Sequence, residues 1–210
     1  MPPTAALSRP FRNRLMAPDG VPDRGPRPRH ERRRLTHVDR GGRPRMVDVS
    51  EKPATARRAV AEAYVTLEQE TLSLIIDGSL AKGDVLTVAE MAGIMGGKRT
   101  AELVPLCHPI PLTDLRVEIT PDRAAGGLRI RATAATVGPT GVEMEALTAA
   151  AVAALTAYDM VKGVDRNAAI RDVQLIEKSG GRSGDWRREQ ADGPRGTRPP
   201  VGTRGPRRCG

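Results

Sequence analysis

The sequence predicts an α+β domain with a ferredoxin-like fold, in which helices pack on one face of an antiparallel sheet. Residues 112–120 alternate apolar and polar side chains, and the alternation resumes at 128 after a glycine-containing loop at 124–127, as in a β-hairpin. A long alanine-rich helix is expected at 141–162 and a last strand at 170–176. The full order is strand, helices, two strands, helix and strand, which suits a sheet covered on one face.

The segments before this hairpin are less distinct. Residues 46–50 are expected to form a short extended piece. Residues 56–67 alternate imperfectly, so that strand and helix remain open for them. Residues 70–76 are expected to be helical and to end at Asp77 and Gly78, a pair typical of a helix C-terminus.

A further helix is expected from residue 85 to about residue 103. Asp84 stands in the position of an N-cap, where a carboxylate accepts hydrogen bonds from the first free backbone N–H groups. Gly96 and Gly97 form a weak point inside the segment, since glycine is a poor helix former. Pro105 ends the helix.

The alanine-rich helix at 141–162 is the most informative segment for function. No charged residue lies between Glu145 and Asp159, so the helix has no polar face and must be covered on most sides. Glu143 and Glu145 stand near its start, and Asp159 and Lys162 near its end. Ionisable groups at the ends of such a buried segment are candidates for chemistry.

The length of this helix implies a shared site. Glu145 and Asp159 are fourteen residues apart, about 21 Å along a helix axis. They cannot both contact one small substrate from the same straight helix. Either they have separate roles, or the end of one helix meets the start of another in a homo-oligomer. The alanine content favours the second alternative, because small side chains let helices approach closely, and most soluble oligomers are symmetric.

Three cationic or acidic residues are candidates for catalysis. Asp159 and Lys162, three residues apart, share a helical face and form either a surface ion pair or an acid/base pair. For acid/base chemistry the lysines are expected to have a lowered pKa. Lys82, between two predicted helices, is either a solvated loop lysine or a cation aimed at a phosphate or a proton-transfer step.

Two loops add candidate substrate contacts. His108 lies in a proline-bracketed turn and is either a catalytic or ligand-contacting residue or a hydrogen-bonded structural one. Cys107 beside it is expected to be a packed small residue, and the pair lacks the further ligands of a zinc site. Lys178 opens the glycine-rich loop at 178–184, whose backbone amides could bind an anion, although the loop is not a Walker A sequence.

The positive net charge of +9 belongs to the ends of the chain. Residues 1–34 carry nine Arg and three acidic residues, residues 187–210 seven Arg and two acidic residues, and residues 35–186 carry 18 basic and 20 acidic residues. We therefore expect a domain at 35–186 between a disordered Arg/Pro-rich arm and a disordered basic tail.

Composition also limits the partners. An RNA-binding module of ferredoxin-like fold is the alternative function, but such modules stack bases on aromatic side chains, and aromatic residues are 2% of this chain. Specific nucleic-acid and membrane partners are therefore not expected. Cys209 lies in the basic tail, so a disulfide with Cys107 is not expected either. Without a recognisable signal peptide, the expected location is the cytoplasm.

Several motifs together resemble one family, that of cyclic pyranopterin monophosphate synthase (molybdenum cofactor biosynthesis protein C, MoaC). The similarity covers about residues 35–186. The motifs that carry it are LTHVD at 35–39, MVDVS at 46–50, IIDG at 75–78, KGD at 82–84, KRT at 98–100, LVPLCHP at 103–109, TGVEMEALT at 140–148, YDMVK at 158–162 and KSGGRSGD at 178–185.

The resemblance implies an activity and an assembly. Members convert (8S)-3',8-cyclo-7,8-dihydroguanosine 5'-triphosphate to cyclic pyranopterin monophosphate and release diphosphate. They are ferredoxin-like lyases that form hexamers, as trimers of dimers, with sites between subunits. No redox cofactor is required; Mg²⁺ could accompany the triphosphate, but the sequence has no dedicated acidic cage for a metal.

The resemblance also assigns roles by motif. It implies that Asp159 is the catalytic aspartate and that Lys82 and Lys162 are proton-transfer lysines. The residues that would line the substrate are Leu106, Cys107, His108, Met144 and Glu145. Lys178 and its loop would supply cations and amides for the phosphates.

Overall fold

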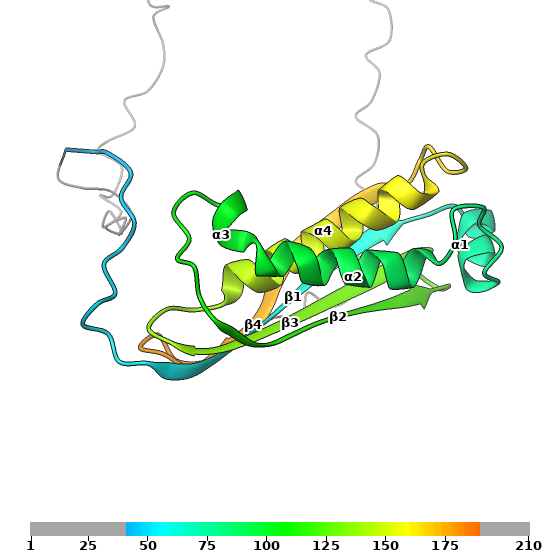
Figure 1. Ribbon diagram of the computed structural model, residues 1–210. Coiled ribbons are helices and arrows are strands. Elements are labelled where there is room, and N and C mark those ends of the chain that lie inside the picture. Colours follow the sequence, from blue (N-terminus) through cyan, green and yellow to red (C-terminus); the bar gives the residue numbers. More distant parts are fainter. Residues whose placement is uncertain (1–40, 190–210) are drawn as a thin grey trace, which may run out of the picture. The chain divides into compact units, whose positions relative to one another are not determined.

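The structure, a computed structural model, describes residues 41–189 and confirms the predicted α+β, ferredoxin-like class. Its centre is a five-stranded sheet in which every neighbouring pair is antiparallel, in the order β2-β3-β1-β4-β5 (Figure 1). The strands are β1 (Thr55–Thr66), β2 (Leu112–Asp122), β3 (Gly127–Gly138), β4 (Ala169–Ser179) and β5 (Trp186–Arg187).

Helices cover one face of this sheet. The two long ones lie side by side across the strands, with α1 at one end (Figure 1). The helices are α1 (Gln69–Ile76), α2 (Val85–Lys98), α3 (Thr100–Leu103) and α4 (Glu143–Val161). The core lies between the sheet and these helices, and alanine supplies much of it.

The ambiguous segment at 56–67 is a strand. β1 pairs with β3 on one side and with β4 on the other, so its backbone is hydrogen-bonded along both edges. Ala59, Ala61 and Ala63 face the helices and are buried, while Val60 is buried on the other face. A central strand buried on both faces loses the simple alternation that identifies a half-exposed strand.

The predicted helix from 85 to 103 is two helices. Asp84 caps α2 as expected, since its side chain accepts a hydrogen bond from the backbone N–H of Thr87 at 3.1 Å. The helical path breaks at Arg99, just after Gly97, and resumes for one turn in α3. The weak point predicted at the glycines is therefore where the helix ends.

Helix α4 is the core helix that its composition predicts, but it is not covered on all sides. Its buried residues include Ala149, Ala153 and Ala157, which pack in the core. Leu155, by contrast, is 60% exposed in the single chain. Among the described residues α4 is the one helix long and apolar enough to span a membrane, yet its alanine stripe is packed inside the protein.

The described region begins with an irregular segment and ends with a short strand. Residues 46–50 form no strand; Asp48 there accepts hydrogen bonds from the backbone N–H and hydroxyl of Ser50, the turn role open to it. Beyond the expected boundary at 186, β5 includes Arg187, and the N–H of Arg188 bonds to the carbonyl of Ile176 at 2.7 Å. The expectations for the arm, for Cys209 and for the tail from 190 lie outside the described residues.

Candidate active site

The C-terminal end of α4 carries a cluster of two lysines and one aspartate. The Lys162 ammonium lies 2.5 Å from one carboxylate oxygen of Asp159, and Lys82 Nζ lies 3.7 Å from the other. Lys82 also donates a hydrogen bond to the backbone carbonyl of Asp159 at 2.8 Å. The α1–α2 loop thus brings Lys82 to the helix terminus, where the dipole favours a cation. The structure joins the three predicted catalytic residues.

The charges in this cluster reinforce one another. The hydrogen bond and charge of Asp159 raise the pKa of Lys162 above its usual value, and the same contact with Lys162 lowers the pKa of Asp159. The expectation of a lowered pKa for Lys162 is therefore wrong in the single chain, because its carboxylate partner outweighs desolvation. Both side chains are more than half exposed, at 54% and 56%. Lys162 is thus an ammonium at neutral pH, suited to bind oxyanions.

A second cluster lies at the N-terminal end of α4. Glu145 is only 5% exposed, and burial raises its pKa, with a further contribution from the charge of Glu143. Burial, followed by the negative charge of Glu145, raises the pKa of the Cys107 thiol. The turn at 106–109 therefore packs beside the start of α4. A buried carboxyl with a raised pKa can hold or transfer a proton near neutral pH.

Lys178 and the glycine-rich loop belong to this second cluster. Lys178 Nζ lies 3.7 Å from a carboxylate oxygen of Glu143 and is hydrogen-bonded to the hydroxyl of Ser183. The loop is closed by Asp185, which accepts a hydrogen bond from the N–H of Gly180 at 3.1 Å. The loop therefore places the Lys178 ammonium against the first turn of α4.

Arg57, which the sequence did not single out, secures this loop. Its guanidinium donates to the carbonyls of Gly138 and Pro139 at 2.9 and 3.3 Å, just before α4. A Cβ at Gly181, where φ is +75°, would collide with the same guanidinium. Arg57 thus links the loop to the approach to α4. Its position in an Arg-Arg pair within an ambiguous strand gave no signal of this role.

The remaining predicted residues lie in the 106–109 turn and on the first turn of α4. His108 Nε2 lies 2.7 Å from the backbone carbonyl oxygen of Val47, which fixes the ring and places its proton on Nε2. This contact agrees with a structural, hydrogen-bonded role for His108. In the neutral ring, Nδ1 is then the nitrogen that can accept a hydrogen bond. Leu106 is half-buried, and Met144 is exposed on the first turn of α4.

The two clusters do not meet within one chain. They stand at opposite ends of the unbroken helix α4, about 21 Å apart between Glu145 and Asp159 at 1.5 Å per residue. In the single chain, Asp159 and Lys162 lie in solvent, far from the turn at 106–109. Across residues 41–189, no group of three or more His, Cys, Asp or Glu side chains is arranged to hold a metal ion.

Comparisons with known proteins identify the family of the chain. Over 155 residues the chain is 61% identical to the cyclic pyranopterin monophosphate synthase of Thermomicrobium roseum, covering 74% of this chain and 93% of that relative. It is 58% identical to the synthases of Brucella ovis and Chloroflexus aurantiacus, over 73% of this chain and 93% and 94% of those proteins. The family model that matches residues 46–181 is that of the MoaC family. The chain belongs to the MoaC family.

Proposed function

We propose that the protein is a cyclic pyranopterin monophosphate synthase of molybdenum cofactor biosynthesis. It converts (8S)-3',8-cyclo-7,8-dihydroguanosine 5'-triphosphate to cyclic pyranopterin monophosphate and releases diphosphate, as a phosphorus–oxygen lyase. The observation that carries the proposal is the 61% identity over 93% of a relative with that name. The RNA-binding alternative is not retained, because this family membership leaves it without support.

The reaction has two parts with different chemical needs. The guanine-derived ring must open and close again, which needs groups that hold and move protons. The α-phosphate must close onto the ribose as diphosphate leaves, which needs cations beside the developing oxyanions. We assign Lys162 and Lys82 to donate protons and stabilise phosphate charge. Asp159 holds both lysines through its carboxylate and backbone carbonyl.

We assign substrate binding to the other end of α4. Glu145, with its raised pKa, is suited to contact the rearranging ring, and Lys178 to contact a phosphate. The further contacts assigned to the substrate are Leu106, Cys107, His108 and Met144. The proposal includes no redox cofactor, and any Mg²⁺ is expected to arrive with the triphosphate. The proposed location of the protein is the cytoplasm.

We propose that one active site combines the two ends of α4 from different subunits of a homo-oligomer, with a hexamer of three dimers as the expected assembly. The separation of the clusters supports this, since a nucleotide-sized substrate cannot reach both from one helix. Exposed apolar side chains on the outer faces of α2 and α4 support it too, because a second copy would cover them. They are Val88, Met91, Met95 and Leu155.

The test is turnover of the cyclic dihydroguanosine triphosphate, with mass detection of the pyranopterin and of diphosphate. Lys162→Ala and Lys82→Ala should each reduce kcat by at least about 100-fold, in the range of lost general acid or electrostatic catalysis. Arg116→Ala, which removes an exposed cation of β2 that pairs with Asp114 outside either cluster, should leave turnover unchanged. A wild-type protein without activity refutes the function, and active Lys162→Ala or Lys82→Ala refutes that lysine's role.

A further inference from the structure

Trp186 stands beside the proposed substrate-binding end of α4 without a role in anything above. It lies in β5, a strand of only two residues that pairs with the end of β4. Trp186 is 41% exposed. We infer that the Trp186 indole is the stacking surface for the flat guanine-derived ring of the substrate. This inference rests on the proposed function and adds a residue to its site.

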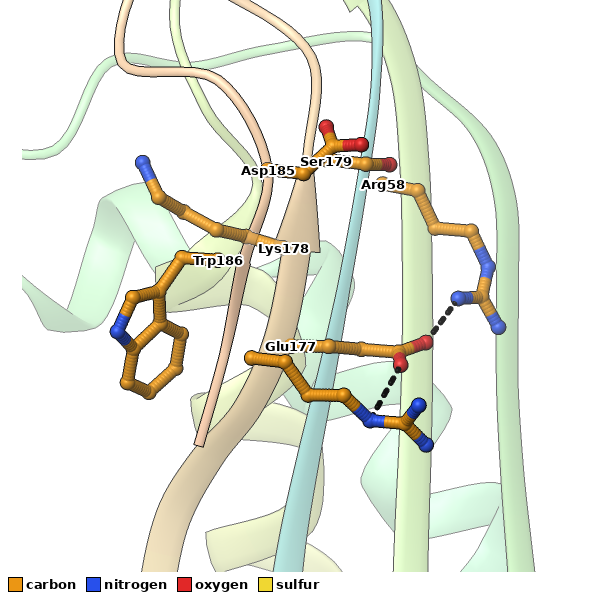
Figure 2. A pocket seen from close by; sticks show the side chains of 7 residues that line it. Arg58, Glu177, Lys178, Ser179, Asp185 and Trp186 are labelled. Carbon is orange, nitrogen blue, oxygen red and sulfur yellow. Dashed lines mark hydrogen bonds and ion pairs between the residues drawn. The ribbon is translucent and has the colours of Figure 1, made fainter. Parts of the chain in front are cut away.

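The register of the sheet sets the direction of the ring. Trp186 is directly opposite Lys178 in the antiparallel β4–β5 pair, and opposite residues point to the same face. Figure 2 shows Lys178 and Trp186 extending to one side of the strands, with Glu177 and Arg58 on the other. Since Lys178 reaches Glu143 on the first turn of α4, the indole shares the side of the sheet that carries the second cluster.

A pocket surrounds this end of the strands. It is lined by Lys178, Ser179, Asp185 and Trp186 and, from the other face of the strands, by Arg58, Glu177 and Arg187 (Figure 2). The Lys178 ammonium suits phosphate, whereas the indole offers a flat apolar surface. The two neighbours therefore match the two halves of a nucleotide: its anionic tail and its planar base.

Trp186 differs in exposure from the other aromatic residues that the structure describes. Of the three that the structure describes, Tyr64 and Tyr158 are half-buried and only Trp186 is exposed. The Arg188 guanidinium lies over the Trp186 ring, 5.6 Å from its centroid, and so fixes its orientation. An exposed, oriented indole beside a loop lysine is arranged as in proteins that hold bases by stacking and backbones by charge.

The chain contains one tryptophan, so its fluorescence reports on Trp186 alone. The full-length protein is titrated with GTP and with inorganic triphosphate, with binding followed by calorimetry and the emission excited at 295 nm. GTP should change the emission and protect the indole from acrylamide quenching. Saturating triphosphate, which lacks the base, should do neither. GTP that binds without changing either signal overturns the inference, as does equal protection by triphosphate.

Kinetics separate stacking from a structural role. Trp186→Ala should raise KM for the cyclic triphosphate by roughly 5- to 100-fold with little change in kcat, because stacking is made equally in the ground and transition states. Trp186→Phe should restore most of the affinity. Val173→Ala, which trims an equally exposed apolar side chain of β4, should have no effect.

The outcomes distinguish this inference from the function on which it depends. An active wild type with unchanged KM in Trp186→Ala refutes the role of Trp186 and leaves the proposed function intact. Absence of turnover in the wild type refutes the function itself. If Trp186→Ala fails to fold, two other measurements decide. Stacking is supported if Trp186→Phe keeps a KM like that of the wild type and GTP protects the wild-type indole from quenching. Stacking is refuted if GTP gives no protection.

Discussion

Two carboxylates on α4 have environments that shift their pKa values in opposite directions. Asp159 is exposed and held between two ammonium groups, and the resulting hydrogen bond and charges lower its pKa. Glu145 is buried, and its pKa is raised instead. The difference follows from their positions, since the first lies at a solvent-facing helix end and the second beneath the 106–109 turn. Two like groups thereby become suited to different tasks.

A buried carboxyl kept for function should reduce stability at neutral pH. Below about pH 4.5 Glu145 is neutral in both the folded and unfolded states and has no net effect. As pH rises from there towards the raised folded-state pKa, the unfolded state loses its proton first, and stability falls. We expect Glu145→Gln to increase the free energy of unfolding at pH 7 and to leave it unchanged at pH 4, measured by urea denaturation.

The control for this prediction is an exposed carboxylate. Glu102→Gln removes the same charge on the surface of α3 and should give no gain that grows with pH. A Glu145→Gln protein that is less stable than the wild type at pH 7 would show that the carboxylate has a stabilising partner. The pH dependence of stability therefore tests the assignment of Glu145 without any substrate.

At the scale of elements, glycines allow α2 and α4 to pack closely. A Cβ at Gly93 would lie 2.9 Å from the carbonyl oxygen of Ala149 and 3.0 Å from the Cβ of Ala153. At Gly96 it would lie 2.7 Å from a methyl group of Val152 in α4. These contacts are shorter than normal packing permits, and one of them is to backbone, which cannot rotate away. The glycines of α2 and the alanines of α4 therefore act together.

Gly93→Ala tests this packing. Alanine should gain about 1 kcal/mol of helix propensity, but overpacking costs about 1–3 kcal/mol, so the free energy of unfolding should not rise and should fall by up to about 2 kcal/mol. Gly163→Ala is the matched control, because nothing lies within 4 Å of its added Cβ. That control should change the free energy of unfolding by no more than about 0.5 kcal/mol. A more stable Gly93→Ala would show that the helices can move apart freely.

The elements also show how far sequence patterns extend. Strands β2 and β3 were predictable because half-exposed strands alternate, and α4 because its composition is uniform. β1 was not, since pairing on both edges and burial on both faces remove the alternation. β5 has two residues and exists only through its bonds to β4, so no local pattern could predict it.

For the whole molecule, local spacing predicted part of the site. It placed Asp159 beside Lys162. Lys82 was a candidate cation in a loop, and only the folded α1–α2 loop brings it to them. The raised pKa of Lys162 was not predictable, because it depends on a contact distance of 2.5 Å. The proposed site combines clusters from more than one chain, so neither a sequence pattern nor the fold of one chain can contain it.

Subunit mixing tests the shared site. Lys162→Ala and Glu145→Gln damage opposite ends of α4, and each variant alone should be inactive. If one site takes one end from each of two chains, dissociating an equal mixture and reassembling it produces some sites with both ends intact. Random pairing in a symmetric assembly restores about a quarter of the wild-type activity.

Reassembly of each variant with itself is the control and should restore nothing. A site built within one chain makes the opposite prediction, because every chain in the mixture carries one damaged end and activity stays at the level of the single variants. Native mass spectrometry of the mixture shows whether hybrids have formed, so an inactive but fully mixed oligomer would refute the shared site. Since α4 separates its two clusters by about 21 Å, we expect activity to return only with the hybrids.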